Sequence, residues 1–368
     1  MKIFLVAGAR PNFVKIAPII RALVSQRTNR LRWKIVHTGQ HYDYDMSEAF
    51  FEDLEIPRPD YYLNAGSGTH ADQTARIMIG FEKVCEKDRP DIVIVVGDVN
   101  STLACSIVAK KDMIRVAHVE AGLRSGDMGM PEEINRIVTD SVSNYFFVTE
   151  KSAINNLLKE GKQKKDIFFV GHVMVDNLYY QIRKLKASDS SIFPTSRIKD
   201  KLNEYAFLTL HRPSNVDDPR VFGEIIEALN QISDEMPILF PVHPRTRKQL
   251  DIHNLKLGPN VTPLSPLGFK ESLFLWKDAN FVLTDSGGLQ EETTALGVPC
   301  FTVRENTERP ITIDEGTNTL IGTGKGDILR AFRTFQKNGG KRGTVPALWD
   351  GCASERIVDI LLKLTRDV

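Results

Sequence analysis

The residues with the clearest chemical meaning form a strand-to-helix turn at positions 285–288, Asp-Ser-Gly-Gly. The apolar run 281–284 before it predicts a buried strand, and the spacing of 288–296 predicts a helix. Two glycines leave the first N–H groups of the helix accessible, and such groups bind anions. Ser286 adds a hydroxyl donor, and Glu292 lies further along the helix, where a carboxylate suits the paired hydroxyls of a ribose. The turn therefore indicates a nucleoside diphosphate site, although an ordinary Ser-Gly helix cap would use the same residues.

Cations occur at two further strand-to-helix turns. Arg309 lies in the segment 304–310 after another apolar strand, so it occupies the same sheet edge and can supply charge to phosphates. Arg10 and Lys15 follow the first strand, where cations oppose the helix dipole and favour a nearby anion. We expect both to reach across a cleft to the diphosphate, with a solvated helix start as the alternative. This first turn lacks the GxGxxG pattern, which argues against a dinucleotide cofactor.

Three carboxylates follow strand ends in the first half of the chain. Asp98 comes after the apolar run 92–96, Glu120 after the run 115–119, and Glu132 opens the next predicted helix. Because parallel strands end at one edge of a sheet, we expect these side chains to converge on one crevice. Converging carboxylates suit proton transfer, whereas each residue alone would more commonly be a cap.

Histidines stand at comparable turns, at His41, His211 and His243. A strand-end histidine can act as a general acid or stabilise a departing phosphate. No HxxxH spacing predicts a metal site, and the four cysteines fit neither a zinc pattern nor a disulfide framework. The GxSxG elbow of serine hydrolases and the GxxxxGK(S/T) loop of P-loop enzymes are both missing. We therefore expect neither a metal nor another cofactor.

Apolar runs that alternate with amphipathic segments predict the elements that position these residues. The first half is expected to hold strands at 3–7, 34–37, 92–96, 115–119, 145–148 and 167–170, with helices at 14–26, 45–53, 101–111, 132–144 and 151–160. A polar segment, 184–201, contains or adjoins the interdomain connection. The pattern then restarts with strands at 207–210, 238–242, 261–264, 281–284, 300–303 and 319–321 and helices at 218–233, 270–277, 288–296 and 326–336. Buried parallel strands with crossover helices indicate an α/β protein with a doubly wound sheet in each half.

The length of 368 residues suits two domains. We expect a Rossmann-like N-terminal domain at 1–171, with a C-terminal helix at 353–368 packing back on it, and a nucleotide-binding Rossmann-like domain at 172–352. Lys and Arg number 48 against 47 Asp and Glu, so the net charge predicts neither nucleic acid nor a membrane surface as partner. No run approaches the roughly 20 apolar residues that span a bilayer. Since the apolar N-terminal run is also too short for a signal peptide, we expect a cytoplasmic location.

Taken in order, the motifs resemble those of the non-hydrolysing UDP-N-acetylglucosamine 2-epimerase family across nearly the full chain. The matching motifs are Gly8-Ala-Arg-Pro11 with Lys15, Gly39-Gln-His41, Gly97-Asp98, His118-Val-Glu-Ala-Gly-Leu-Arg124, Pro131-Glu-Glu-Ile-Asn-Arg136, Leu210-His-Arg212, His243-Pro-Arg245, Asp285-Ser-Gly-Gly-Leu-Gln-Glu-Glu292 and Thr307-Glu-Arg-Pro310. The resemblance implies two Rossmann-like domains facing across a cleft, as in GT-B glycosyltransferases, and a homodimer. It also implies that the substrate is a UDP-sugar and that the enzyme interconverts UDP-GlcNAc and UDP-ManNAc.

The resemblance further implies roles for individual positions. Catalytic or supporting roles fall to Asp98, Glu120, Glu132 and His211. UDP would be held by Arg10, Lys15, Ser286, Gly287, Gly288, Glu292 and Arg309, with the stretch from Leu267 to Ser272 beside the uracil. Some members bind a second UDP-GlcNAc as an activator, and the accessory positions here would be Gln40, His41, Gln73, Arg136, Arg212 and His243. Because Asp43 replaces an expected glutamine beside that set, its charge would oppose a second diphosphate.

The sugar itself suggests the mechanism. The hydrogen at C2 is not next to a carbonyl, so removing it directly would give an unstabilised carbanion. If UDP departs from C1, a carboxylate can take the C2 proton from the oxocarbenium-like centre and leave 2-acetamidoglucal. UDP then adds back after protonation from the other face, which amounts to anti elimination and syn addition. This route needs a carboxylate near each face of C2 and a strong diphosphate clamp.

Other activities stay open at this point. The same reaction on a UDP-2,3-diacetamido uronic acid sugar would use the same nucleotide clamp. A hydrolysing relative would release free ManNAc, and a retaining glycosyltransferase would need an acceptor. A non-catalytic nucleotide-sugar sensor would keep the clamp but has no need of three converging carboxylates.

Overall fold

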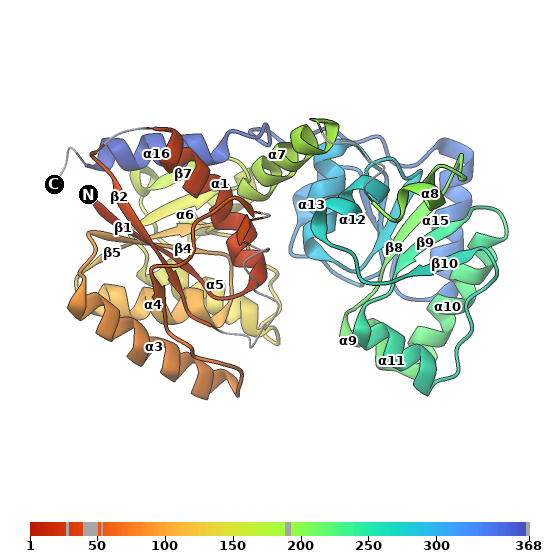
Figure 1. The fold of residues 1–368 in the computed structure, drawn as a ribbon, viewed down its shortest axis with the longest axis horizontal. Coiled ribbons are helices and arrows are strands. Elements are labelled where there is room, and N and C mark those ends of the chain that lie inside the picture. Colours follow the sequence, from red (N-terminus) through yellow and green to blue (C-terminus); the bar gives the residue numbers. More distant parts are fainter. Residues whose placement is uncertain (27–28, 40–50, 53, 188–192, 366–368) are drawn as a thin grey trace. The chain divides into compact units, whose positions relative to one another are not determined.

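The structure of the protein is a computed structural model that describes residues 1–26, 29–39, 51–52, 54–187 and 193–365 (Figure 1). The chain forms two compact units, residues 1–177 with 347–368 and residues 178–346. Each unit is built on its own parallel sheet. None of the helices within the described ranges is long and apolar enough to cross a membrane.

The first unit has a seven-stranded sheet in the order β3-β2-β1-β4-β5-β6-β7. Its strands are β1 (Lys2–Ala7), β2 (Arg32–His37), β3 (Tyr61–Tyr62), β4 (Ile92–Val96), β5 (Arg115–Val119), β6 (Tyr145–Val148) and β7 (Ile167–Phe169). Its helices are α1 (Arg10–Ser25), α3 (His70–Lys87), α4 (Asn100–Lys111), α5 (Pro131–Val142), α6 (Lys151–Lys159) and α16 (Ala353–Leu364), while α7 (Val173–Ala187) continues into the second unit. All five residues of β4 are buried, as expected for a strand with helices over both faces.

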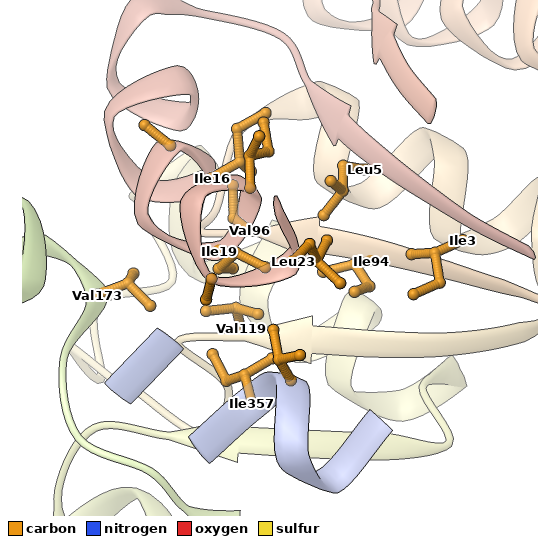
Figure 2. Packing of buried hydrophobic residues seen from close by; sticks show 14 of the residues in the cluster. Ile3, Leu5, Ile16, Ile19, Leu23, Ile94, Val96, Val119, Val173 and Ile357 are labelled. Atoms are coloured by element: carbon orange, nitrogen blue, oxygen red, sulfur yellow. The ribbon is translucent and has the colours of Figure 1, made fainter. Parts of the chain in front are cut away.

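One face of this sheet packs against α1 and α16 (Figure 2). Ile16, Ile19 and Leu23 recur at helical spacing along α1 and join Ile94 of the sheet in one buried cluster. Ile357 of α16 belongs to the same cluster, so the C-terminal helix packs back on the first unit as predicted. Each such side chain contributes about 2 kcal/mol by leaving water. Side chains of α3 and α4 cover the opposite face.

The second unit has a six-stranded sheet in the order β10-β9-β8-β11-β12-β13. Its strands are β8 (Ala206–Thr209), β9 (Ile238–Pro241), β10 (Val261–Leu264), β11 (Phe281–Thr284), β12 (Cys300–Thr302) and β13 (Asn318–Leu320). Its helices are α8 (Ser196–Lys199), α9 (Pro213–Val216), α10 (Pro219–Ser233), α11 (Pro244–Ile252), α12 (Phe269–Trp276), α13 (Gly287–Leu296), α14 (Pro310–Asp314) and α15 (Lys325–Asn338). Side chains of α10 and α15 pack with the sheet in one apolar core.

The predicted α/β fold is confirmed, and every predicted strand is present with ends shifted by at most two residues. The predicted helix at 45–53 falls largely outside the described residues. Helix α3 was not predicted, although Thr69 caps its first turn and Ile77, Phe81 and Cys85 recur every four residues. Strand β3 and the helices α7 and α8 were not predicted either. The same holds for three helices whose signal is proline at the first helical position, Pro213, Pro244 and Pro310.

The strand order of each sheet reverses at a central pair, β1 and β4 in the first unit and β8 and β11 in the second. Open α/β sheets bind their ligands beyond the carboxyl ends of the strands at such a reversal point. The helices that begin there are α1 and α4 in the first unit and α9 and α13 in the second. Each unit therefore presents one edge where a ligand site is expected.

Candidate functional site

The turn predicted to bind a diphosphate joins β11 to α13 at the reversal point of the second sheet. Helix α13 begins at Gly287, and Ser286 is its N-cap in an extended conformation. The Ser286 N–H donates to Thr284 Oγ1 at 2.9 Å. Within the part of the chain that the structure describes, the Ser286 side chain makes no capping hydrogen bond to α13. The first turn of α13 carries no acidic residue. The first N–H groups of α13 are therefore available to an anion.

Asp285 organises this turn from within the unit. Its wholly buried carboxylate accepts the N–H groups of His211 at 2.9 Å and Arg212 at 2.8 Å. Its other oxygen lies 2.9 Å from Nδ1 of His211. Burial alone would raise the pKa of Asp285, but His211 and the backbone donors hold it below its ordinary value. Because Asp285 engages Nδ1, Nε2 is the nitrogen through which His211 would act on a ligand.

A second carboxylate, Glu308, stands beside the same turn. A β-carbon on Gly287 would lie 2.9 Å from Glu308 Oε1, so the absence of a side chain there lets the carboxylate approach. Arg304 donates to Glu308 Oε2 at 2.9 Å, and Arg212 Nη2 lies 3.7 Å from Oε1. Burial would raise the pKa of Glu308, but Arg309 and Arg304 lower it to about 2. The turn is thus lined by cations that Glu308 partly balances.

Glu292 and Arg309, both predicted to contact UDP, have different electrostatic environments. Arg309 is buried, and its Nε lies 2.5 Å from Glu291 Oε1. Burial, together with the charge of Glu291, raises the pKa of Glu292 to about 8. Glu292 is therefore mostly protonated at neutral pH. A protonated carboxyl can donate to one ribose hydroxyl and accept from the other.

The remaining predicted residues of the second unit lie near α11 and α12. Leu267 precedes α12 and is half-buried, and Ser272 lies within α12, where its N–H is used by the helix. His243 is the N-cap of α11, and its Nδ1 accepts the N–H of Arg245 at 3.2 Å. Its ring lies 5.9 Å from that of His211, and burial together with His211 lowers the pKa of His243. The two histidines therefore form a pair at neighbouring strand ends.

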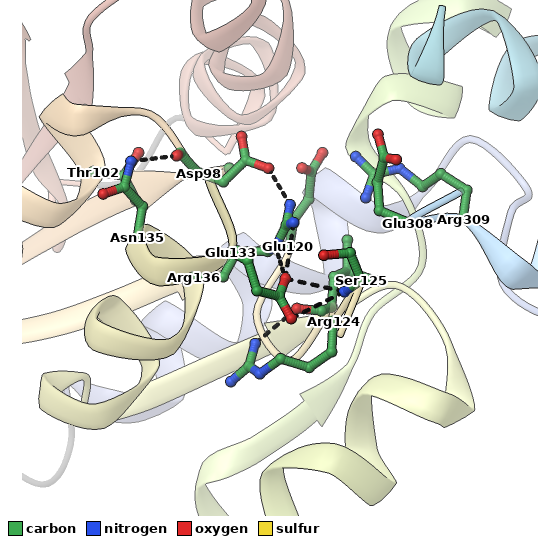
Figure 3. A network of polar contacts seen from close by, with 12 residues as sticks. Asp98, Thr102, Glu120, Arg124, Ser125, Glu133, Asn135, Arg136, Glu308 and Arg309 are labelled. Carbon is green, nitrogen blue, oxygen red and sulfur yellow. Dashed lines mark hydrogen bonds and ion pairs between the residues drawn. The ribbon is translucent and has the colours of Figure 1, made fainter. Parts of the chain in front are cut away.

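In the first unit, Asp98 follows β4 and takes part in a polar network (Figure 3). Arg136 Nη1 lies 2.5 Å from Asp98 Oδ2, and Arg136 Nε donates to Glu133 at 3.0 Å. Glu133 also accepts the N–H groups of Ser125 and Gly126. Burial would raise the pKa of Glu133, but these donors and Arg136 lower it. Glu133 thus fixes the guanidinium that holds Asp98.

Glu120 follows β5 and is almost wholly buried. Lys15 Nζ lies 2.6 Å from Glu120 Oε2. Glu120 has a φ of 69°, a left-handed conformation that costs a residue with a side chain about 1 kcal/mol. Gly97 approaches the same ion pair, since a β-carbon there would lie 2.9 Å from Lys15 Nζ. The structure therefore pairs Lys15 with a carboxylate of its own unit.

The other predicted residues of the first unit are more dispersed. Glu132 is exposed in the first turn of α5, and Arg10 is exposed as the first residue of α1. Gln73 is buried on α3, where its side chain donates to the backbone of the preceding loop. Gln40 and His41 lie outside the described residues.

Strand register brings the two strand-end carboxylates, the half-buried Asp98 and the buried Glu120, to one edge. Val96 of β4 is paired with Val119 of β5, and Asp98 and Glu120 follow these strands directly. In the ranges that the structure describes, no group of three or more His, Cys, Asp or Glu is arranged to hold a metal ion.

Three buried acidic residues in these networks were not predicted from the sequence: Glu133, Glu291 and Glu308. Each directly precedes or follows a residue that was singled out. Helical phase is the signal that could have found Glu133, because a residue three positions before Arg136 shares its face of α5. The other two pair with arginines through tertiary contacts that leave no local pattern.

Comparison with known proteins decides the family. A family model described as UDP-N-acetylglucosamine 2-epimerase matches residues 24–362. The chain belongs to the UDP-N-acetylglucosamine 2-epimerase family. This confirms the resemblance seen in the motifs, and this family member is an isomerase of the epimerase class.

Individual relatives cover essentially the whole of this epimerase. The UDP-N-acetylglucosamine 2-epimerase of Methanocaldococcus jannaschii is 44% identical over 98% of this chain and 99% of its own length. The UDP-2,3-diacetamido-2,3-dideoxy-D-glucuronate 2-epimerase of Pseudomonas aeruginosa is 42% identical over 99% of this chain and 100% of its own. A crystal structure of the M. jannaschii UDP-GlcNAc 2-epimerase in complex with UDP-GlcNAc and UDP matches with a TM-score of 0.86 and 42% identity, covering 99% of this chain and 100% of that chain.

Proposed function

We propose that this epimerase interconverts UDP-N-acetylglucosamine and UDP-N-acetylmannosamine by inversion at C2. The observation that carries the proposal is the pair of strand-end carboxylates, Asp98 and Glu120, each held by a cation. Inversion at C2 requires a proton acceptor or donor near each face of the sugar, whereas binding alone requires neither. The substrate named for the M. jannaschii relative supports the same choice.

The reaction is an elimination followed by a re-addition. One carboxylate takes the C2 proton while the C1–O bond breaks, and the electron pair of that bond leaves with the β-phosphate oxygen of UDP. The product is 2-acetamidoglucal, with UDP retained. The carboxylic acid on the opposite face, protonated from solvent, then delivers a proton to C2, and the UDP oxygen bonds to C1 again. Anti elimination and syn addition leave C1 unchanged and invert C2.

Asp98 and Glu120 are the proposed proton-transfer residues, with Glu132 at the exposed start of α5 in a supporting role. His211 is proposed to stabilise charge on the β-phosphate through Nε2, because Asp285 engages its Nδ1. Positioned electrostatic groups of this kind contribute several kcal/mol of transition-state stabilisation.

The start of α13 is the proposed diphosphate site. The N–H groups of Ser286, Gly287 and Gly288 would donate to phosphate oxygens, as helix N-termini do. Glu292 is assigned to the ribose hydroxyls and Arg309 to the charge of the phosphates. The stretch 267–272 is proposed to contact uracil mainly through its backbone, and Arg10 and Lys15 of the first unit are proposed to add positive charge to the same diphosphate.

NMR of UDP-GlcNAc incubated with the protein in deuterated water tests the reaction. We expect UDP-ManNAc to accumulate to an equilibrium mixture, with deuterium at C2 and with no acceptor added. Epimerisation without deuterium at C2 would contradict the elimination route. Release of free ManNAc would indicate hydrolysis, and binding without any turnover would indicate a sensor.

The P. aeruginosa relative makes a second substrate worth testing. The nucleotide clamp described above does not distinguish UDP-GlcNAc from a UDP-2,3-diacetamido uronic acid. The two sugars are therefore compared in the same NMR assay at equal concentration. A kcat/KM at least ten-fold higher for the uronic acid sugar would replace the first assignment by this alternative.

The accessory residues are proposed not to support activation by a second UDP-GlcNAc. In this structure Arg136 contacts Asp98, and Arg212 donates to the carbonyl of Asp285, so both serve the networks already described. We expect UDP-ManNAc alone to be converted with hyperbolic kinetics. A sigmoidal curve, or a requirement for added UDP-GlcNAc, would overturn this expectation.

We also propose that the protein is a cytoplasmic homodimer. All four cysteines are free thiols, which suits a reducing compartment. Ile79 on α3 and Met113 after α4 are large apolar side chains that are mostly exposed, and an interface would bury them. Light scattering during size exclusion tests the assembly, and a monomer mass at micromolar concentration would refute it.

A further inference from the structure

His118 lies between the two strand ends that carry the proposed proton-transfer residues. It belongs to β5, is wholly buried, and precedes Glu120 by two positions. Its Nε2 lies 2.8 Å from the carbonyl oxygen of Gly97, in the turn after β4. Its Nδ1 lies 2.7 Å from Oδ1 of Asp140 on α5. One ring therefore ties the end of β4 to α5 across β5.

The acceptors around the ring are themselves held in place. Asp140 Oδ2 accepts the N–H of Gly122 at 3.0 Å and lies 2.7 Å from Arg124 Nη2. Burial alone would raise the pKa of Asp140, but His118 and Arg124 hold it below its ordinary value. The ring of His118 therefore lies between an anchored carboxylate and a backbone carbonyl, within hydrogen-bonding distance of both.

These bonds hold a strained segment of backbone. The carboxylate of Asp140 contacts the ring of His118, two positions before Glu120, and accepts the N–H of Gly122, two positions after it. Glu120, with its left-handed φ of 69°, is thereby anchored on both sides. The N–H of Gly97 donates to the carbonyl of Val119 at 3.1 Å, so both polar groups of this residue are tied to β5 just before Asp98.

We infer that His118 is a positioning residue for the reaction, because its buried ring holds the turns that carry Asp98 and Glu120. It acts through Gly97 and Asp140, and we assign it no contact with the substrate. This inference rests on the proposed function, and it adds a residue to the machinery of that reaction.

The replacement His118→Gln removes the double contact, because an amide side chain cannot reach both partners at once. We expect kcat for UDP-GlcNAc to fall about 10- to 100-fold, as small displacements of reacting groups do. KM and the Kd for UDP should stay within about three-fold, because only Arg10 and Lys15 among the proposed UDP contacts belong to the first unit and the others belong to the second. An unchanged kcat in a folded variant would overturn the inference.

His172→Gln is the matched control. His172 is as buried as His118 and belongs to the same unit. Its Nδ1 accepts the N–H of Met174 at 3.1 Å, and its ring packs edge-on against Trp349 at 5.0 Å. This variant loses a comparable buried ring, so we expect kcat to stay within about two-fold. A loss of kcat equal to that of His118→Gln would show that only packing is lost, which would also overturn the inference.

Failure of the inference and failure of the proposed function give different results. Wild-type protein that does not epimerise UDP-GlcNAc refutes the function. Wild-type turnover with an unaffected His118→Gln variant refutes the positioning role. If His118→Gln does not fold, Asp140→Asn is measured in the same way, because it weakens the same contact to the ring. An unchanged kcat in that variant would then overturn the inference.

Discussion

Replacing Glu292 by glutamine should stabilise the protein, and the gain should depend on pH. Burial and the charge of Glu291 raise the pKa of Glu292 from 4.5 to about 8. The folded protein therefore favours the protonated carboxyl, while the unfolded chain favours the carboxylate at neutral pH. The cost that this environment adds to folding is absent below about pH 4.5 and grows as the pH rises towards 8.

The magnitude follows from these two pKa values. Taking up a proton on folding costs about 3 kcal/mol at pH 7 and about 1 kcal/mol at pH 5, at 1.36 kcal/mol per pKa unit. Glu292→Gln removes this cost, because an amide resembles the protonated carboxyl and has no charge to lose. Any misfit of the amide affects both pH values equally. The difference between the gains at pH 7 and pH 5 should therefore be about 2.5 kcal/mol.

Urea unfolding at pH 5 and pH 7 measures this difference. Tryptophan fluorescence and circular dichroism are compared because the two units can unfold separately. Glu291→Gln is the matched control. It removes the partner of Arg309 and should destabilise the protein at pH 7. Equal effects of Glu292→Gln at both pH values would refute the reasoning, since the carboxyl would then not change its charge on folding.

Three further predictions concern catalysis and backbone geometry. Asp98→Asn and Glu120→Gln should each lower kcat by roughly 1,000-fold while the Kd for UDP changes by less than about three-fold, and normal turnover in either would remove that residue from the mechanism. Gly122→Ala should cost about 3 kcal/mol or more in urea unfolding, because Gly122 has a φ of 77° and its β-carbon would lie 2.5 Å from a backbone oxygen. Gly126→Ala is its control, with a φ of 74° but open space around it, and a cost equal to that of Gly122→Ala would contradict the steric argument. Asp285→Asn should lower stability by about 3 kcal/mol, seen as a lower thermal midpoint, because an amide cannot replace a buried carboxylate that accepts two backbone N–H groups.

The strands of both sheets other than β3 were predicted from the sequence because burial on two faces leaves continuous apolar runs. Most long helices were predicted from their amphipathic spacing. Ile92 to Val96 is such a run, and its predicted bounds are those of β4. Helix α3 was harder to see, because four of its 18 residues are buried and the rest of its surface is polar. The short helices α9, α11 and α14 bury little apolar surface, so their proline starts are their main signal.

The sequence predicted where the candidate residues lie in the fold, but it did not predict which side chains they contact. Strand ends indicated where Asp98 and Glu120 would lie, because parallel topology fixes which ends share an edge. The local pattern also indicated that Lys15 needs an anion, and the structure supplies one in Glu120, 105 positions away along the chain. No local pattern encodes such a contact. The same holds for His118 and Asp140, which are 22 positions apart and meet only in the folded unit.

The turn at 285–288, which is the proposed diphosphate site, is surrounded by four acidic residues. Their negative charges would repel a diphosphate if nothing compensated them. Asp285 is engaged by backbone N–H groups and a histidine, Glu291 by Arg309, and Glu308 by buried arginine, so each of these three charges is compensated. Glu292, the fourth, is mostly uncharged at neutral pH. The helix N-terminus therefore keeps its attraction for phosphate. In the proposed reaction, that attraction would matter most while the C1–O bond is broken, because only retained UDP could add back to the glycal and complete an epimerisation.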